Sequence, residues 1–371
     1  MTEVRFCKEC LMISTRPRIE FDEDGVCNAC RWAKAKKNNL VDWAKRNEEL
    51  ELLIEKTGKS KGFDIVCPVS GGKDSSYVAY MLKKKGLNFL MVTLQPPLPH
   101  EIGLKNLEES IKRGGDHIRI TPNFEAGRRM AKKMLIERGM PLWAWTASVQ
   151  TAIFRVAVLF KIPMVMFGEE GETEYGGSRK LENKITYDVN ESIGLYLSGH
   201  DPVEIAKSLG IDEREMYWWQ YPTKEEISEL GLSVMHWSYF EDWNPYRNYL
   251  TSKEHMGLAE SPVRSIGTYN NFAQTDTKLY DLHTYLMFLK FGFGRCTQDV
   301  CIDIRRGAIT RKQGINLIKA YDGEYPEPYI KDYLEYFQMS AEEFDAVLDK
   351  WVNKDILVKH EGRWNKKFEI E

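Results

Sequence analysis

The sequence predicts an α/β fold, with a parallel sheet covered by helices, a cysteine-rich N-terminal module and a helical C-terminal region. Three observations support this prediction. Short apolar runs alternate with helix-like segments from residue 63 to residue 167. A glycine-rich turn, Ser70-Gly71-Gly72, joins the first apolar run to a helix, and two C-x2-C pairs precede it. Alternation of this kind is typical of a parallel sheet with both faces covered.

Composition and charge exclude several classes of protein. Of 371 residues, 43% are hydrophobic and 12% are aromatic, which is ample for packed cores. The net charge of −3 provides no general attraction to nucleic acid or to a membrane, so we expect neither as a partner. The first residues lack the apolar core of a signal peptide, and no apolar run is long enough to span a bilayer. We therefore expect a cytoplasmic protein.

The N-terminal module, predicted over residues 1–36, carries four regularly spaced cysteines. Cys7, Cys10, Cys27 and Cys30 follow the pattern C-x2-C, sixteen residues, C-x2-C, which is typical of a zinc ribbon. In a reducing compartment such pairs favour metal binding over disulfides. Four ligands leave no open position, so the predicted Zn²⁺ is structural. A redox dithiol or an iron–sulfur cluster is the alternative.

The elements of the sheet domain, predicted over residues 37–180, follow in order. Helical spacing of apolar residues predicts a helix over residues 40–58, ended by Gly58. Strands are expected at residues 63–69, 88–94, 116–120 and 163–167. One helix is expected to follow the glycine turn and to end at residue 85, and further helices are expected at 102–113, 124–138 and 146–161. Ligands bind beyond the carboxyl ends of such strands, so we expect Thr93, Gly168 and Glu169 near the glycine turn.

The strongest functional signal is the loop Ser70-Gly71-Gly72-Lys73-Asp74-Ser75-Ser76. Adjacent glycines let a ligand approach the backbone closely. The helix that follows presents unpaired N–H groups, which suit a phosphate. Lys73 adds a positive charge, and Asp74 can hold a metal ion bound to the same phosphates. The loop is not the Walker motif. The alternative is an ordinary turn followed by a capped helix.

A second signal is the acidic segment after the fourth strand. Glu169, Glu170, Glu172 and Glu174 lie between glycines. Clustered carboxylates favour Mg²⁺, so we expect all four where magnesium bound to pyrophosphate would sit, with Asp74 and Glu169 as ligands. An acidic surface loop is the alternative.

The C-terminal half is predicted as two units. Residues 181–262 are rich in aromatic residues and read as an inserted lobe, in which the rings either stack on a ligand or pack internally. Residues 263–371 read as mainly helical, with a small cap at the end. Their arginines suit a diphosphate or a uronate, and the alternative is a charged face balanced by Asp299 and Asp303. The arginines are Arg295, Arg305, Arg306 and Arg311.

The glycine loop resembles the SGGxDS loop of the PP-loop (N-type) ATP pyrophosphatases, which implies their Rossmann-like, adenine nucleotide alpha hydrolase-like fold. Further blocks select a family within this group. They are Gly103-Leu-Lys-Asn106, Ile120-Thr-Pro-Asn123, Glu174-Tyr-Gly-Gly177, Arg264-Ser-Ile-Gly-Thr-Tyr269, Lys290-Phe-Gly-Phe-Gly-Arg295, Ile304-Arg305, Ile309-Thr-Arg311 and Tyr321-Asp-Gly-Glu324. With the cysteine pairs, the chain resembles the N-acetyl sugar amidotransferases of bacterial surface-polysaccharide pathways (WbpG- and PseA-like enzymes).

The resemblance implies an ATP-dependent enzyme that converts an acetamido group of a nucleotide-linked sugar to acetamidino, for lipopolysaccharide O-antigen or flagellin glycan. It implies adenylylation, attack by ammonia, and a separate glutaminase with a HisF-like ammonia-channel subunit. The implied catalytic residues are Lys73, Asp74 and Glu169. The implied ATP-binding residues are Ser70, Gly71, Gly72, Lys73, Asp74, Ser75, Ser76, Thr93 and Gly168. The implied substrate-binding residues are Asn106, Glu174, Tyr175, Lys290, Arg295 and Arg305.

Two segments depart from the pattern of this family, and two other functions compete. Residues 142–146 replace a Pro-Phe and Gly-Gln stretch, and the run 274–278 carries one aspartate where a pair is expected. A PP-loop enzyme that thiolates tRNA is the first competitor, with Cys67, Cys296 or Cys301 carrying sulfur. Against it stand the acidic net charge and the lack of a basic stripe. A zinc-module binding protein with an inactive loop domain is the second, and intact Lys73-Asp74-Ser75 argues against it.

Overall fold

The computed structural model describes residues 4–57, 62–189 and 192–370, which contain a five-stranded sheet in the order β3-β2-β1-β4-β5. Every neighbouring pair of strands runs parallel. The strands are β1 Ile65–Pro68, β2 Phe89–Leu94, β3 His117–Ile120, β4 Met164–Phe167 and β5 Ser233–His236. The strand order reverses between β1 and β4, and ligands bind at such a switch point in open α/β sheets. The predicted α/β fold is confirmed.

The fifth strand is a correction to the sequence analysis, which expected the alternation of strands and helices to stop at residue 181. β5 lies inside the aromatic-rich segment and pairs with β4 from Met164 opposite Ser233 to Phe167 opposite His236. Only Val234 and Met235 are apolar in this four-residue strand, so no periodicity marks it. Part of the predicted inserted lobe therefore completes the sheet.

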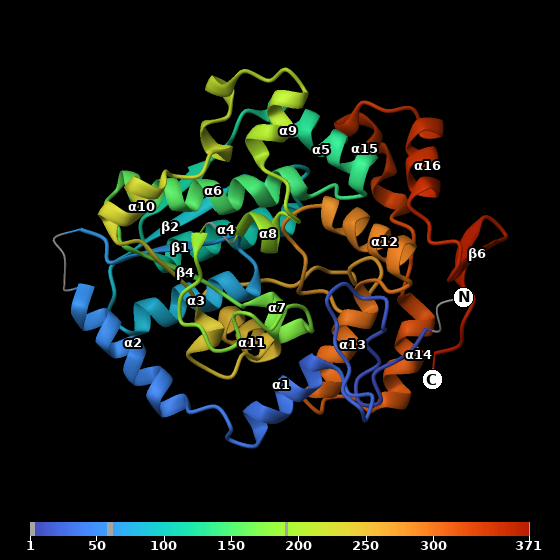
Figure 1. The fold of residues 1–371 in the computed structure, drawn as a ribbon, viewed down its shortest axis with the longest axis horizontal. Helices are drawn as coiled ribbons and strands as arrows, with labels where there is room; N and C mark the ends of the chain where they lie inside the picture. The colour runs from blue at the N-terminus through green and yellow to red at the C-terminus, as the bar shows by residue number, and fades with distance from the viewer. Residues whose placement is uncertain (1–3, 58–61, 190–191, 371) are drawn as a thin grey trace.

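Helices cover both faces of the sheet, because the side chains of β1 alternate between two buried clusters. Ile65 and Cys67 pack with residues of the face that carries α2, α3, α4 and α11. Val66 packs with the opposite face, formed by α6 and α10. In Figure 1, α6 lies on one side of the strands and α3 and α11 on the other. The bounds are α2 Trp43–Thr57, α3 Lys73–Lys84, α4 Glu101–Gly114, α6 Trp143–Leu159, α10 Lys224–Leu230 and α11 Pro245–His255.

All five helices predicted for the sheet domain are present, and their observed ends lie within three residues of the expected ones. The helix expected over residues 40–58 is α2, which ends at Thr57, and Gly58 itself lies outside the described residues. Asn123 caps α5 by accepting a hydrogen bond from the Ala126 N–H (3.0 Å), and Gly139 ends it in the left-handed conformation. Further helices are α5 Phe124–Arg138, α7 Gly171–Tyr175, α8 Ser192–Tyr196 and α9 Pro202–Ser208, and the 3-10 turns are η2 Glu213–Glu215, η3 Tyr217–Trp219 and η4 Trp237–Tyr239.

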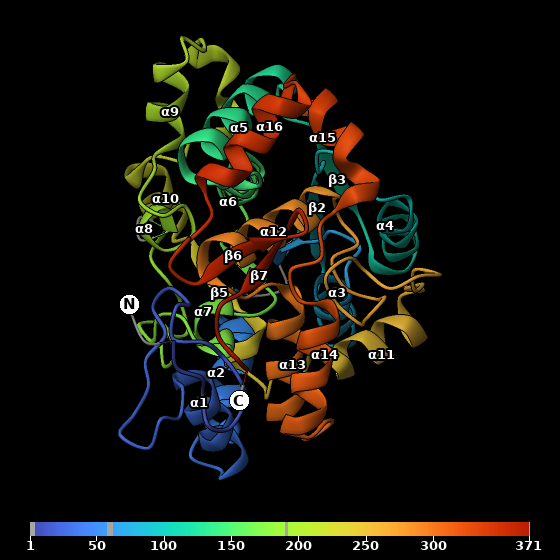
Figure 2. The same cartoon turned by 90° about the vertical axis from the view of Figure 1, so that its right-hand side faces the viewer.

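The C-terminal region is helical, as predicted, and its last residues form an antiparallel hairpin of β6 and β7. α15 lies against α5 of the sheet domain, and both share one buried cluster with α12 and α16 (Figure 2). The elements are α12 Leu279–Phe291, α13 Arg295–Arg305, α14 Arg311–Tyr321, η5 Glu327–Tyr329, α15 Ile330–Phe337, α16 Ala341–Lys350, β6 Leu357–His360 and β7 Arg363–Lys366.

The described residues of the cysteine-bearing module share their buried core with the C-terminal helices. Its helix α1, Asn28–Lys37, follows two short antiparallel bridges, and its cysteines and Leu11 pack with Cys296 and Val300 of α13 and Ile318 of α14. About thirty residues bury too little apolar surface to fold alone, which explains the shared core. None of the helices formed by the described residues combines the length and apolar character that a membrane crossing requires.

Candidate functional site

A cavity of about 720 Å³ lies at the carboxyl ends of β1 and β4. One wall is the glycine loop together with Gly168, Glu169 and Tyr175, which follow β4. The opposite wall is formed by residues 269–276 and by the face of α13 that carries Arg295, Asp299 and Asp303. The site is therefore assembled from the sheet domain and the C-terminal helices, and the switch point of the sheet is where the two meet.

The glycine loop packs so closely against α4 that residue 71 has to be a glycine. Gly71 has φ +84°, and a Cβ built there would lie 2.4 Å from the backbone nitrogen of Leu107. The loop is held by Ser75, whose hydroxyl accepts from the Ser70 N–H at 3.1 Å and donates to the Gly72 carbonyl at 3.3 Å. α3 begins directly afterwards, at Lys73, and its N-cap residue Gly72 provides no side-chain cap for the first N–H groups of the helix. This backbone suits an anion.

Lys73 and Asp74 form an ion pair at the start of α3, and both side chains line the cavity. α11 supports this pair from behind. Asn248 Nδ2 donates to Asp74 Oδ1 at 3.1 Å, and the Ser252 hydroxyl donates to the Lys73 carbonyl at 2.7 Å. Both supporting residues are fully buried. No motif in the sequence marked this role, because it depends on the packing of α11 against α3.

Glu169 lines the same cavity as the ion pair and interacts electrostatically with both of its members. Burial and the neighbouring Asp74 carboxylate raise the pKa of Glu169 to about 7, while Lys73 opposes the shift. The Tyr175 hydroxyl donates weakly to Glu169 Oε1 at 3.5 Å, and burial raises the pKa of Tyr175 above its usual range. Asp74 and Glu169 repel each other when both are ionised, and a divalent cation between them would relieve this repulsion. The two carboxylates therefore fit the predicted Mg²⁺.

The acidic segment divides its carboxylates among different tasks, whereas the sequence analysis expected all four at the magnesium. Of the four, Glu169 is the one that lines the cavity. Glu170 caps α7 by accepting from the Glu172 and Thr173 N–H groups at 3.2 and 2.7 Å. Glu172 and Glu174 accept hydrogen bonds from the N-terminal module. A five-residue helix turns these side chains in different directions, which the clustering in sequence does not reveal.

Asp276 is a cavity residue that the sequence analysis missed. Its Oδ1 atom is buried, has no hydrogen-bond partner among the described residues, and lies 3.7 Å from the place of a Cβ on Gly72. Burial raises the pKa of Asp276 to about 6, against the opposing effects of the Ser70 hydroxyl and Lys73. The sequence signal for this residue is that Asp276 is the one aspartate in Gln274-Thr-Asp-Thr-Lys278, where the family that the chain resembles is expected to have two.

The wall from α13 pairs each arginine with a carboxylate. Arg295 Nη2 lies 2.9 Å from Asp299 Oδ1, and the Arg306 Nε donates to Asp303 Oδ1 at 2.7 Å. The Tyr269 hydroxyl also donates to Asp303, at 2.7 Å. This wall is close to neutral, and it offers a polar surface with aromatic rings at its edge. Of the four arginines singled out in the sequence, Arg295 and Arg306 line the cavity.

Other predicted site residues are not among those that line the cavity. Thr93 donates to the Val69 carbonyl at 2.6 Å and so ties β2 to the loop. Asn106 exchanges two hydrogen bonds with the backbone of Ala259, at 3.0 and 2.8 Å. Lys290 donates to the Arg138 carbonyl at 2.9 Å, and Arg305 approaches the Glu174 carbonyl at 3.5 Å. The remaining two, Gly71 and Ser76, are buried in the loop and in α3.

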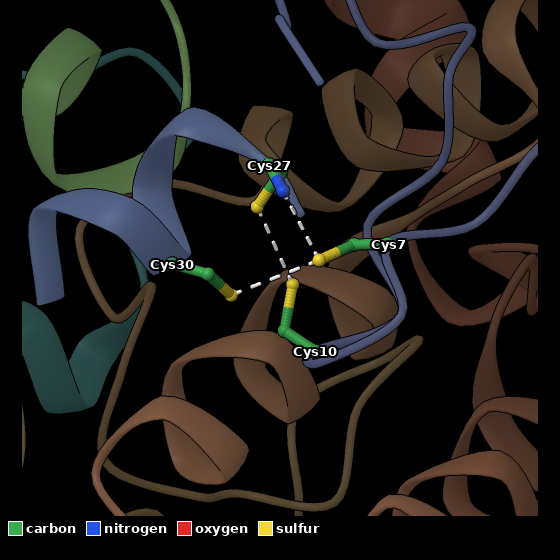
Figure 3. A group of neighbouring side chains, drawn as sticks. All are labelled: Cys7, Cys10, Cys27 and Cys30. Atoms are coloured by element: carbon green, nitrogen blue, oxygen red, sulfur yellow. Dashed lines mark hydrogen bonds between the residues drawn. The ribbon is translucent and has the colours of Figure 1, made fainter. Parts of the chain in front are cut away.

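The four module cysteines form a second candidate site, away from the cavity. Their sulfur atoms point toward one another (Figure 3), with Cys7 and Cys30 at 3.8 Å and Cys10 and Cys27 at 3.7 Å. Thiolates at roughly 2.3 Å from zinc in a tetrahedron lie roughly 3.8 Å apart. The four ligand atoms lie within 4.8 Å of one another, and all four residues are buried. The cluster therefore fits a tetrahedral metal such as zinc.

Comparison with known proteins adds one family match. Residues 266–369 match the model of the C-terminal domain of LPS biosynthesis proteins described as WbpG-like. The glycine loop and the sheet lie outside the matched segment. No curated protein matches the chain. A solved NMN synthetase from Francisella tularensis is similar at 13% identity and a TM-score of 0.27, over 60% of this chain and 98% of that one. At this score the similarity carries no argument.

Proposed function

We propose that this chain is an ATP-dependent amidotransferase that converts the acetamido group of a nucleotide-linked N-acetyl sugar into an acetamidino group. The proposal is supported most by the composition of one cavity. Its phosphate-type loop, Ser70–Ser75, faces lining residues between positions 269 and 306, all of which lie within the segment that matches a C-terminal domain of LPS biosynthesis proteins. A nucleotide and a sugar substrate can meet in such a place. The surface polysaccharide or a flagellin glycan is the proposed destination of the product.

The proposed reaction needs ATP because an amide oxygen is a poor leaving group. The acetamido oxygen attacks the α-phosphorus of ATP, the bond to the β-phosphate oxygen breaks, and pyrophosphate leaves. Ammonia then attacks the imidate carbon, AMP departs with the former amide oxygen, and a proton is released. The products are acetamidino sugar, AMP and pyrophosphate. Holding the two reactants together supplies much of the acceleration, so no protein nucleophile is required.

Five cavity residues have a role in this scheme. The backbone of Gly72 and the first turn of α3 bind phosphate oxygens, and Lys73 provides a positive charge beside them. Asp74 and Glu169 would hold Mg²⁺, which supplies charge neutralisation to the departing pyrophosphate. Asp276 is ionised near neutral pH, since its pKa is about 6, and can accept the proton that ammonia loses on attack.

We also propose that ammonia comes from a separate glutaminase through a HisF-like channel subunit. Four of the seven cysteines form the metal cluster, and Cys67, Cys296 and Cys301 are buried. No cysteine is among the residues that line the cavity, so the chain lacks a thiol placed to hydrolyse glutamine there. Glutamine alone should then support no activity, whereas ammonium should. Full activity with glutamine and no added subunit would contradict this part of the proposal.

A nucleotide assay tests the function. Purified protein is incubated with ATP, Mg²⁺, ammonium chloride and a panel of UDP-N-acetyl sugars, and AMP, pyrophosphate and the mass of the sugar are followed. We expect AMP with at least one sugar, in step with a product in which NH replaces oxygen. Lys73→Met should abolish it, whereas Lys84→Met, at the exposed end of the same helix, should not. AMP formed only with tRNA and a sulfur donor, or no AMP at all, would overturn the proposal.

A further inference from the structure

The short helix α7 separates the cavity from the cysteine-bearing module. Glu169 lies just before this helix and Tyr175 is its last residue, and both line the cavity. A helix of five residues does not hold its position by its own hydrogen bonds, because helices this short are unstable in isolation. The placement of Glu169 and Tyr175 therefore depends on contacts that other parts of the chain make with α7.

The first of these contacts is a bidentate ion pair. Arg18, in the loop between the two cysteine pairs, donates from Nε to Glu172 Oε2 at 2.7 Å and from Nη2 to Glu172 Oε1 at 2.6 Å. Glu172 also accepts from the Ser178 N–H at 2.8 Å, so the same carboxylate joins the module to both ends of the α7 turn. Paired N–H···O bonds of this kind fix orientation as well as distance.

The second contact is a buried set of hydrogen bonds to Glu174. Trp32 Nε1 donates to Glu174 Oε1 at 2.8 Å, and Lys36 Nζ donates to Glu174 Oε2 at 2.8 Å. The side chains of Lys36 and Glu174 are 7% and 10% exposed, and Lys36 also pairs with Asp242 at 3.1 Å, so opening the contact would leave the Glu174 carboxylate buried without a charged partner. Both donors lie on α1, one turn apart, and together they occupy both oxygens of Glu174.

The third contact joins the residues after α7 to the first turn of α1, which lies between Cys27 and Cys30. Asn28 Nδ2 donates to the Gly177 carbonyl at 2.7 Å. The residue after α7, Gly176, faces Ala29 so closely that a Cβ on it would lie 3.3 Å from the Ala29 Cβ. Asn28 and Ala29 lie between Cys27 and Cys30, in the first turn of α1. A metal bound to these cysteines would fix the turn that holds the end of α7.

From these contacts we propose that the cysteine-bearing module positions α7, with Arg18, Asn28, Trp32 and Lys36 as positioning residues that keep Glu169 and Tyr175 in the cavity. Metal at the four cysteines then acts on the geometry of the catalytic cavity as well as on the stability of the fold. The consequence for Mg²⁺ and ATP rests on the proposed function. The placement of α7 itself does not, and it can be measured without any substrate.

The experiment weakens the contacts between the cysteine-bearing module and α7 without removing a buried charge. The double variant Arg18→Gln with Trp32→Phe keeps the Lys36–Glu174 pair and the aromatic ring beside it. Arg31→Gln is the matched control, because Arg31 lies on the same module and pairs with Glu20 and Asp22 inside it, at 3.9 and 4.0 Å. Arg18→Gln alone, at a side chain 47% exposed, serves if the double variant does not fold.

Hydrogen–deuterium exchange without substrate is the first readout. We expect faster exchange over residues 168–178 in the double variant and in protein stripped of metal by a chelator, with little change over residues 69–76. The control should match the wild type. Unchanged exchange over residues 168–178 in both the double variant and the stripped protein would overturn the proposal.

The Mg²⁺ dependence of AMP formation is the second readout. A module that only stabilised the fold would leave this dependence unchanged. The Mg²⁺ concentration for half-maximal rate should rise by about 10-fold in the double variant, because losing the residues that hold a metal ligand in place typically weakens metal binding by that factor. Altered exchange with an unaltered Mg²⁺ requirement would overturn the link to the cavity. If wild-type protein makes no AMP with any sugar, the proposed function fails, and the exchange experiment still decides the placement of α7.

Discussion

At the scale of single residues, the cavity brings Lys73, Asp74 and Glu169 of the sheet domain together with Asp276 of the C-terminal region. Lys73, Asp74 and Glu169 were predicted from a loop motif and from the position after β4, and all three line the cavity. Asp276 was missed, because it comes from a segment distant in sequence that folds onto the loop. The four glutamates after β4 were expected to act together, and a five-residue helix sends them to different partners. Motifs report residue type and spacing, but they do not report which way a short helix turns.

The raised pKa of Glu169 leads to a prediction about stability. Its pKa in the folded protein is about 7 against an ordinary 4.5, so the folded chain holds this proton where the unfolded chain releases it. The stability of the fold should therefore fall as pH rises from about 4.5 to about 7 because of this group. Glu169→Gln removes that cost, so its melting temperature should exceed that of the wild type at about pH 8, with a smaller gap at about pH 5.

The same variant should lose activity, because a carboxamide is a weaker ligand for Mg²⁺ than a carboxylate. Thermal melting at the two pH values and the AMP assay measure the two effects on one protein. A variant that is less stable than the wild type at about pH 8 would contradict the account of Glu169. Glu170→Gln is a poor control, since it removes the cap of α7. Glu137→Gln, on the exposed side of α5, is suitable.

At the scale of elements, the order and type of the strands and helices were largely predictable, since hydrophobic periodicity reports which residues are buried. β5 escaped because four residues are too short for a period to appear. The role of α11 escaped for another reason. Its Asn248 and Ser252 support the ion pair at the start of α3 through long-range packing, which no local pattern encodes.

The close approach of the glycine loop to α4 gives a prediction at this scale. Gly71→Ala should destabilise the fold by more than about 1 kcal/mol and abolish AMP formation, because the added Cβ meets the Leu107 backbone at a positive φ. Gly210→Ala is the matched control. Gly210 also has a positive φ, +63°, but a Cβ there meets nothing within 4 Å. Melting curves and nucleotide binding compare the two, and equal losses in both variants would show that strain alone, rather than the contact with α4, is responsible.

At the scale of the whole molecule, the C-terminal helices share one buried core with the cysteine module and another with the sheet domain, and they form the cavity together with the sheet domain. The sequence predicted a zinc ribbon, a sheet domain, an aromatic-rich inserted lobe and a helical region, with limits where the composition changes. The shared core of Cys10, Leu11, Val300 and Ile318, and the cavity built by two regions, were not predictable, because no pattern along one segment reports its packing partner.

This shared core predicts a global effect of metal removal. A chelator should lower the melting temperature of the whole protein in a single transition, because the cluster lies against α13 and α14 rather than in a separate domain. Metal content per chain and calorimetry measure this. Cys27→Ser should start from the lower melting temperature and show no further shift with chelator. A small separate transition, with the main one unmoved, would contradict the shared core.

The measurement that tests the central claim most directly follows one oxygen atom. An N-acetyl sugar that supports AMP formation is prepared with a heavy oxygen isotope in its acetamido group and is incubated with ATP, Mg²⁺ and ammonium. The account predicts that the heavy oxygen appears in the phosphate of AMP and that the sugar product contains none. Heavy oxygen retained in the sugar, or AMP formed without it, would contradict adenylylation of the acetamido oxygen.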